Sequence, residues 1–288
     1  MPLVKTLFDN RAIISVCGTD QVSFLQGIVT QDVANLTDGT SCYGALLTPQ
    51  GKLIADFFVI RHQGNLLLDC AAGIAETLLK RLKLYKLRAR VDVTDATFAW
   101  RVGAIWSQDA QPVSLTPDGL ASHDDPRLTS LGQRLLVAAD QLAAYEHVDA
   151  SPADQKAHDA HCLNLGVPFF GTGFGAEQVF PLDINFDALN GIDYRKGCFV
   201  GQEVASRMKR KGEIRKRTWI VNTDGAPLEV GQAIKAGEST IGEITAASGE
   251  KGLAMVRLDR RAKASGDATT ETNVPITLLQ PAYLGDVT

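Results

Sequence analysis

Paired cysteines are missing from this sequence. Its five cysteines (17, 42, 70, 162 and 198) are odd in number and widely separated, and none forms a Cys-x-x-Cys pair. This pattern argues against a disulfide framework and against a self-contained zinc or cluster site, so we expect no bound metal. No apolar run approaches the ~18 residues that span a bilayer, and the first residues, Met-Pro-Leu-Val-Lys, lack the apolar core of a secretory signal. We therefore expect a cytoplasmic protein that does not act at membranes.

An excess of positive charge is missing too. The net charge is −4, which argues against nucleic-acid binding as the primary activity. The sequence has no Gly-x-Ser-x-Gly elbow, which argues against serine hydrolase chemistry. Residues 171–175 are rich in glycine, but no Lys-Ser or Lys-Thr pair follows them, so we interpret them as a loop and not a phosphate site.

The chain has 288 residues, 45% of them hydrophobic, enough to bury a sizeable core divided over two or three domains. Alternating apolar and polar residues predict strands over 12–17, 42–47, 53–60, 65–70, 89–93 and 97–106. Apolar residues at helical spacing predict helices over 22–29 and 74–85. Pro152 predicts the start of another helix, because the first helical position tolerates proline. Residues 107–130, rich in Pro, Asp, Gln and Ser, favour a loop.

The pattern changes after residue 217. Short β segments separated by Gly and Asp follow, over 218–221, 233–235, 240–245, 253–258 and 275–279. Segments of this kind fit a small barrel. The sequence therefore predicts an α+β fold with a larger region over residues 1–212 and a β-barrel domain over residues 217–288.

Residues 196–203 read Lys-Gly-Cys-Phe-Val-Gly-Gln-Glu and carry the densest chemistry of the chain. Lys196 supplies a cation, and Cys198 supplies a thiol that can act as a nucleophile or a metal ligand. Gln202 and Glu203 add an amide and a carboxylate. Because so polar a set fills a core poorly, we favour a functional interpretation over a buried, inert cysteine.

The flanks of this octapeptide predict its local structure. Gly197 and Gly201 allow the backbone to turn sharply or to approach a ligand closely. Residues 191–195 alternate as in a short strand, and residues 202–209 are good helix formers. We therefore expect Cys198 in a turn just before a helix, close to Arg195 and Lys196. Positive charge and helix-end amides both stabilise a thiolate there.

The octapeptide resembles the hallmark of the YgfZ family, folate-binding relatives of the glycine-cleavage T-protein that are linked to iron–sulfur cluster assembly and repair. Residues 180–186 and 189–192 resemble the family's approach to this motif, and residues 20–33 resemble its first helix. Residues 231–232 and 241–245 resemble the C-terminal barrel of the T-protein. The resemblance covers most of the chain. It implies two interleaved ferredoxin-like domains plus the barrel, arranged as a ring around a folate cavity.

The resemblance also implies a cofactor and partners. Tetrahydrofolate, or a related reduced folate, would fill the cavity, and iron–sulfur assembly proteins or cluster-containing client enzymes would be the partners. Cys198 would be a redox-active thiol or transient ligand, with Lys196 stabilising its thiolate. Arg11 and His158 lie near positions that face the ligand in relatives, where either could stack on a pterin. The predicted folate contacts are Arg11, His158, Lys196, Gln202 and Glu203.

The sequence departs from the T-protein at its acidic residues. Aminomethyltransferases carry two adjacent aspartates after a Gly-Gly turn, one of them catalytic, and the matching residues here are Ile54 and Ala55. Asp56 is displaced by one residue, which on a strand turns a side chain to the opposite face, so we do not expect it to substitute. Cys198 stands where T-proteins have an aspartate after Lys-Gly. Glycine-cleavage activity is therefore not expected.

Two alternative functions stay open. The first is a tetrahydrofolate-dependent one-carbon transferase or demethylase that uses Asp56, Glu203 or Cys198. The second is an RNA-associated module, for example in tRNA modification, that uses the basic run over residues 207–217. That run could bind a folate glutamate tail, RNA or an acidic partner, or simply be a solvated surface.

A third cluster, His158, His161 and Cys162, has a spacing that can serve a metal, but it lacks the further ligands that such a site needs. Stacking of His158 on a pterin is the interpretation we favour.

Overall fold

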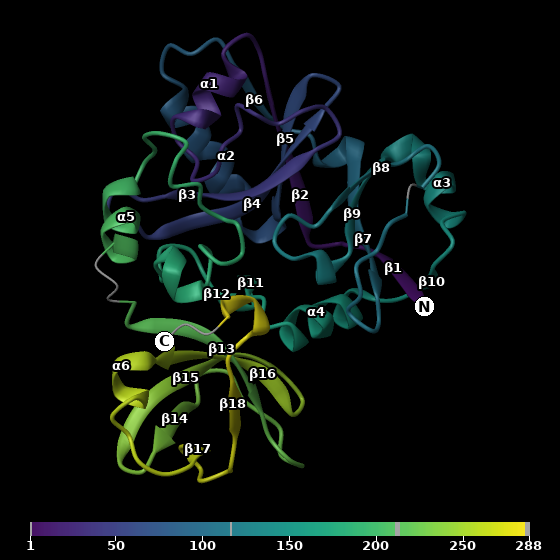
Figure 1. Cartoon of the computed structure of the whole chain (residues 1–288). Helices are drawn as coiled ribbons and strands as arrows, with labels where there is room; N and C mark the ends of the chain where they lie inside the picture. The colour runs from purple at the N-terminus through teal and green to yellow at the C-terminus, as the bar shows by residue number, and fades with distance from the viewer. Residues whose placement is uncertain (1, 116, 211–213, 286–288) are drawn as a thin grey trace.

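The structure, a computed structural model, describes residues 2–115, 117–210 and 214–285. Three large β-sheets, besides a two-stranded one, form the framework of the described chain (Figure 1). Two five-stranded sheets lie in the upper part of the view, and a six-stranded sheet formed by the C-terminal residues lies below them. Helix α4 (Gln155–Asn164) lies between these parts and contacts both β1 and β16.

One five-stranded sheet is antiparallel, with strand order β3-β4-β5-β2-β6. Its strands are β2 (Arg11–Cys17), β3 (Ser41–Leu47), β4 (Leu53–His62), β5 (Asn65–Ala71) and β6 (Asp92–Asp95). Helices α1 (Gln21–Gln26) and α2 (Ala72–Lys86) cover one face. Ile74, Leu78 and Leu82, the stripe that predicted α2, pack there against strand residues.

The other five-stranded sheet has the order β10-β1-β7-β9-β8. Its strands are β1 (Leu3–Leu7), β7 (Trp100–Ser107), β8 (Ala121–Asp124), β9 (Gln133–Ala138) and β10 (Ser151–Pro152), and α3 (Leu142–Glu146) follows β9. The two sheets are interleaved in the chain, because β1 precedes all strands of the first sheet and β7 to β10 follow them. They share one apolar cluster, to which β1 contributes Val4 and β4 contributes Phe58.

The C-terminal sheet has the order β17-β14-β15-β16-β13-β18. Its strands are β13 (Lys216–Asn222), β14 (Ala233–Ala236), β15 (Ser239–Ser248), β16 (Lys251–Arg257), β17 (Ala268–Thr270) and β18 (Thr277–Leu279), with α6 (Leu258–Arg261) after β16. Within the described residues, β17 and β18 form its two edges and do not pair with each other. The predicted barrel is therefore an open half-barrel.

Some predicted elements differ from the structure. Residues 191–195 form no strand, because Gly191 and Asp193 bond to the side chain and backbone of Thr30 instead of a strand partner. Pro152 does not begin a helix but pairs in β10 with Lys5. Asp154 is the actual cap of α4, since its side chain accepts a hydrogen bond from Ala157 N.

Residues 107–130, predicted as a loop, contain the short strand β8. Three further short elements complete the path toward the octapeptide: β11 (Phe169–Phe170), β12 (Gly173–Phe174) and a 3-10 turn over Pro181–Ile184.

A buried chain of opposite charges joins the two interleaved sheets. Asp69 on β5 accepts hydrogen bonds from Arg11 on β2 (2.6 Å) and from Arg134 on β9. Arg134 also lies 3.9 Å from Asp125, which binds Arg127 through two side-chain bonds of 2.9 and 2.7 Å. Burial acts to raise the pKa of Asp69, but Arg11 and Arg134 hold that pKa below its usual value.

Replacing Asp69 by asparagine should therefore be strongly destabilising. Asp69→Asn keeps the shape of the side chain but leaves the mostly buried Arg11 without its nearest counter-charge and the buried Arg134 with only the more distant Asp125, which costs about 3–5 kcal/mol in comparable cases. Urea unfolding of the two proteins measures the difference. Glu76→Gln, which removes the exposed partner of Lys80, is the matched control and should change little. Equal effects of the two substitutions would contradict the role given to the buried chain.

Candidate functional site

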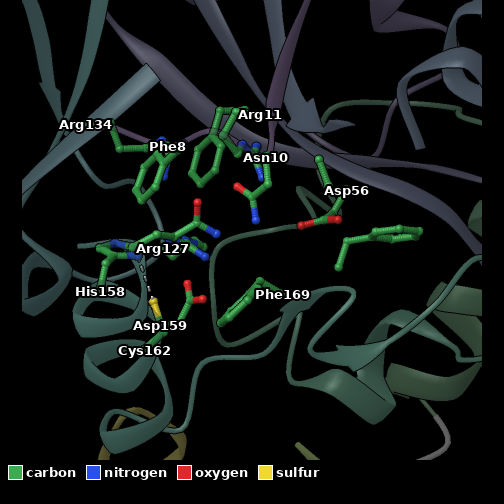
Figure 2. A pocket seen from close by; sticks show the side chains of 14 residues that line it. Phe8, Asn10, Arg11, Asp56, Arg127, Arg134, His158, Asp159, Cys162 and Phe169 are labelled. Atoms are coloured by element: carbon green, nitrogen blue, oxygen red, sulfur yellow. Dashed lines mark hydrogen bonds between the residues drawn. The ribbon is translucent and has the colours of Figure 1, made fainter. Parts of the chain in front are cut away.

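A pocket lies where the two interleaved sheets meet α4 and β11 (Figure 2). Four phenylalanine rings, from Phe8, Phe58, Phe169 and Phe170, form apolar walls. Three guanidinium groups, from Arg11, Arg127 and Arg134, line it as well. The cavity between these side chains has a volume of about 40 Å³. The pocket thus combines flat apolar surfaces with positive charge.

Asp56 lies in this pocket. Its Oδ2 accepts a hydrogen bond from the hydroxyl of Tyr43 (2.8 Å), and its Oδ1 has no partner among the described residues. Burial raises the pKa of Asp56, against the influence of Arg11 and Arg127. Figure 2 shows its carboxyl group turned toward the space enclosed by the lining residues.

The position of Asp56 corrects one expectation. Asp56 does lie on the opposite face from Ala55, as strand alternation requires. The pairing of β3 with β4 is irregular, because Leu46 pairs with Ala55 and Leu47 with Leu53, which leaves Ile54 unpaired. Ile54 and Ala55, although adjacent, therefore both pack in the apolar cluster beneath α1 and α2. The face that carries Asp56 is the one that lines the pocket. Asp56 therefore lines the pocket because of the displacement that argued against it as a substitute.

His158 and Cys162 lie one turn apart on α4 and both line the pocket. The Cys162 Sγ lies 3.8 Å from His158 Nδ1, and burial raises the pKa of Cys162 to about 12, so its thiol stays protonated. Burial, with Arg134 and Arg127 nearby, holds the pKa of His158 well below its usual value. A neutral ring that accepts at Nδ1 carries its proton on Nε2. We therefore assign Nε2 as a donor; it has no partner among the described residues.

His161 does not join His158 in the pocket. Its Nε2 bonds to the backbone oxygen of Ser130 (2.9 Å), and its ring stacks on Trp106 with 6.0 Å between centroids. Across the described parts of the chain, no group of three or more His, Cys, Asp or Glu side chains is arranged to hold a metal ion.

The octapeptide lies outside the pocket, and none of its residues is among the pocket's lining residues. It forms a loop followed by α5 (Gln202–Arg210), so Cys198 lies before a helix, as expected. Cys198 is exposed. Gly197 and Gly201 have φ values of +99° and +80°, the conformation that the predicted turns require. At Gly201 a Cβ atom would lie 2.7 Å from the oxygen of Thr48, so a side chain there is sterically excluded.

Lys196 and Gln202 bond to the backbone. The Lys196 ammonium group donates to the oxygens of Gln26 (2.6 Å) and Val29 (2.5 Å), and Gln202 Nε2 donates to Gly197 O (2.9 Å). Partial burial lowers the pKa of Lys196 to about 8. Glu203 pairs with Arg207 on the outer surface of α5.

Of the predicted folate contacts, the structure thus brings Arg11 and His158 together and leaves Lys196, Gln202 and Glu203 elsewhere. Gln202 and Glu203 line a separate groove on α5, together with Tyr194, Ser206, Lys209 and Arg210.

The basic run is not a continuous cationic surface. Arg217 is buried and bonds to both carboxylate oxygens of Asp187, at 2.5 and 3.0 Å, so it supports the fold. Lys209 lies over the ring of Tyr194, 4.0 Å from its centroid. Residues 211–213, the middle of the run, lie outside the described residues. The contacts of Arg217 reduce the charge that this run can offer to RNA or to an anionic tail.

Sequence reasoning missed Arg127, Arg134 and Gln155 as pocket residues. Arg127 lies in a segment that was predicted as a loop, and Arg134 lies on β9. Neither belongs to a recognisable sequence motif. Only Arg134 carries a signal, because it is a charged residue in a segment, 131–137, whose other residues are buried.

Comparison with known proteins places the chain among relatives of two kinds. Residues 7–113 match the GCVT N-terminal domain family, and residues 215–286 match the family described as CAF17, C-terminal beta-barrel domain. The crystal structure of glycine cleavage system aminomethyltransferase T from Bartonella henselae superposes with a TM-score of 0.77 over 98% of this chain and 86% of that one. At 17% identity this likeness establishes the fold, an α+β T-protein-like fold with a C-terminal half-barrel.

Three relatives carry the name iron-sulfur cluster assembly factor IBA57 homolog, mitochondrial. The protein of Pyricularia oryzae is 30% identical over 88% of this chain and 72% of its own length. That of Mycosarcoma maydis is 32% identical over 72% of this chain, and that of Dictyostelium discoideum is 31% identical over 74%. The matches span only 54% and 60% of the length of these last two relatives. No helix in the described part of the chain is long and apolar enough to cross a membrane.

Exposure should decide which cysteine reacts first. Cys198 is exposed, whereas burial raises the pKa of Cys42, Cys70 and Cys162 to about 12 and keeps them as thiols. Brief treatment with substoichiometric iodoacetamide near pH 7 should label Cys198 ahead of all others, with those three slower by more than about a hundredfold.

Peptide mapping by mass spectrometry measures the order, and urea-unfolded protein, in which all five should react alike, is the control. Slow labelling of Cys198 in the folded protein would show that the octapeptide does not present a reactive thiol.

Proposed function

This chain belongs to the family of iron–sulfur cluster assembly factors that includes IBA57, YgfZ and CAF17 and is related to the aminomethyltransferases. From this premise, we propose that the protein is a folate-binding factor for cluster assembly or repair. Tetrahydrofolate, or a related reduced folate, would bind in the pocket between the sheets and α4. Cys198 would act on partners at the surface. These partners would be assembly proteins or cluster-containing client enzymes.

The unpaired polar atoms of the pocket carry this proposal. Nine buried side-chain polar atoms lack a partner among the described residues, and four of them belong to pocket residues. Two are acceptors, Asp56 Oδ1 and Gln155 Oε1, and two are donors, Arg134 Nε and His158 Nε2. An unpaired buried polar atom costs about 1–3 kcal/mol. A ligand with donors and acceptors along its edges would pair several of these atoms at once.

A pterin has this chemistry. Its fused ring carries N–H donors, ring nitrogens and a carbonyl along its edges, and its flat faces suit phenylalanine rings and guanidinium planes. The guanidinium groups of Arg11, Arg127 and Arg134 bind the carboxylates of Asp69 and Asp125 and can also donate to an anionic group such as the glutamate tail of a folate. Asp56 and Asp159 line the pocket too, so the charge of the lining alone does not select an anionic ligand. Because the space for a water-sized molecule is only about 40 Å³, binding requires lining side chains to move outward.

The separation of the two sites gives Cys198 a distinct role. Since Cys198 is exposed and does not line the pocket, it is placed to meet a macromolecule or a cluster and not the pterin. All five cysteines are free, which suits the reducing cytoplasm that we propose for the protein.

A second candidate function, one-carbon transfer to or from tetrahydrofolate, is favoured by one observation. Asp56 is a buried carboxyl group in the pocket with a raised pKa, the property expected of a proton-transfer residue. Against it, the aspartate pair of the aminomethyltransferases is replaced by Ile54 and Ala55.

Tetrahydrofolate should bind with micromolar affinity, roughly −8 kcal/mol. His158→Ala removes one donor from the pocket and should weaken binding about tenfold, whereas His158→Gln, which keeps an N–H donor, should lose less. Isothermal titration calorimetry measures these affinities. Lys209→Ala, in the outer groove of α5, is the control and should leave the affinity unchanged. Absence of heat and of a thermal shift at millimolar ligand would refute the proposal.

Glycine-cleavage activity should be absent. Ile54 and Ala55, which stand in place of the aspartate pair, cannot move a proton. The assay is ammonia release from the aminomethyl-lipoyl intermediate in the presence of tetrahydrofolate, with an aminomethyltransferase as the positive control. Release that depends on Asp56, and disappears in Asp56→Asn, would establish the one-carbon alternative instead.

A further inference from the structure

Lys196 and Gln26 hold each other through reciprocal hydrogen bonds. The Lys196 ammonium group donates to the backbone oxygens of Gln26 (2.6 Å) and Val29 (2.5 Å). In return, Gln26 Nε2 donates to the backbone oxygen of Lys196 (3.4 Å). Gln26 Oε1 accepts from the backbone N–H groups of Val33 (2.9 Å) and Ala34 (3.2 Å). One amide side chain thus ties the end of α1 to the start of the octapeptide.

Further bonds continue this attachment along the two segments. Thr30 Oγ1 donates to Gly191 O (2.6 Å), and Asp193 N donates to Thr30 O (3.0 Å). Gln31 Nε2 donates to Asn190 O (2.6 Å). The segment 190–196 is therefore bonded to residues 26–34 at four positions, 190, 191, 193 and 196, although about 160 residues separate the two segments in sequence.

The other end of the loop is held as well. Gln202 Nε2 donates to Gly197 O (2.9 Å). Gly51 and Gly201 allow a close contact of the turn before β4 with the start of α5, because a Cβ atom at Gly51 would lie 2.7 Å from Val204 Cβ. Cys198 is the exposed thiol between these two fixed ends.

The charge of Lys196 is used by these contacts. The charged and titratable groups that face it are Asp32, Cys42 and Asp193, and the Phe199 ring lies 5.3 Å from Nζ. Two of its three N–H donors bond to carbonyl oxygens at the C-terminal end of α1 and just beyond, where oxygens lack helical partners. Among the contacts recorded for the described residues, none joins this ammonium group to the Cys198 thiol.

We propose that Lys196 is a positioning residue, which fixes Cys198 at one place on the surface by locking the loop to residues 26–29, and does not act by neutralising the thiolate. The inference rests on the proposed function only in one respect: it takes Cys198 as the thiol that acts on partner proteins. A fixed thiol lowers the ordering cost when a partner docks, because the loop does not have to be immobilised at that moment.

Two variants separate position from charge. Lys196→Met removes the ammonium group and keeps the length of the side chain. Gln26→Met keeps the Lys196 charge and its bond to the Gln26 backbone oxygen, but it removes the bonds of the Gln26 side chain to Lys196 O, Val33 N and Ala34 N. Arg195→Met is the matched control, because it removes a positive charge one residue before Lys196. The Arg195 side chain is 96% exposed and contacts Asp193 at 3.9 Å.

Hydrogen–deuterium exchange of residues 197–201 and the pH profile of Cys198 alkylation are the two measurements. We expect exchange to accelerate on the order of tenfold in Lys196→Met and in Gln26→Met, and to stay unchanged in Arg195→Met. The pH of half-maximal alkylation should be the same in all four proteins, and the double variant should exchange little faster than either single one.

The opposite pattern would overturn the inference. If Lys196→Met raises the pH of half-maximal alkylation while exchange of residues 197–201 stays at the wild-type rate, Lys196 acts through its charge. Should Lys196→Met fail to fold, Lys196→Gln decides, because it removes the charge and keeps an N–H donor for the backbone oxygens: a higher pH of half-maximal alkylation with wild-type exchange in that variant refutes the inference. Lys196 does not line the pocket, so a failure of tetrahydrofolate to bind would remove the folate proposal and leave the loop measurement valid.

Discussion

A buried alternation of charges, from Arg11 through Asp69, Arg134 and Asp125 to Arg127, is the interaction on which the rest of this structure depends. Each of these ions loses its hydration on folding, and each is compensated only by the next one in the chain. The five come from β2, β5, β9 and the segment between β8 and β9, so the compensation exists only when both interleaved sheets are in place. Phe58 completes the arrangement, with guanidinium carbons at 3.9, 4.9 and 5.9 Å from its ring centre.

The pocket takes its properties from this charge chain. Arginines held by aspartates on one side present their remaining donors and their flat faces on the other. Burial, together with the charge of Arg134 and Arg127, lowers the pKa of His158 and keeps its ring neutral. The arginines Arg11 and Arg127 also act to lower the pKa of Asp56, but the effect of burial is larger and the pKa is raised. The polar atoms left unpaired in the pocket are therefore a consequence of how the two sheets are joined. The thiol of Cys198, by contrast, is displayed on a loop whose fixation owes nothing to these charges.

Whether a structural feature could be predicted from the sequence depends on whether it is determined by neighbouring residues. The helix after the octapeptide, the two glycine turns, the meander of β3 to β5 and the apolar stripe of α2 all follow from neighbouring residues and were predictable. The pocket was only partly so, because Phe8, Asp56, Arg134 and His158 come from four separate parts of the chain. The face of Asp56 could be derived from alternation, but which face carries the pocket could not. Likewise, Lys196 is adjacent to Cys198 in sequence, yet its long side chain turns toward Gln26 and Val29.

The interleaving of the sheets also sets an order of assembly. All strands of the sheet β3-β4-β5-β2-β6 lie within residues 11–95, so this sheet can form as soon as that stretch has left the ribosome. Strand β1 cannot, since its partners are β7, around residue 100, and β10, at residues 151–152. The buried ammonium group of Lys5 likewise forms its hydrogen bonds only after residues 145–148 are synthesised, because its acceptors are the backbone oxygens of Tyr145, Glu146 and Val148. Strand β1 thus waits longer for its partners than the strands of the first sheet do, which makes it a segment that chaperones have reason to cover during synthesis.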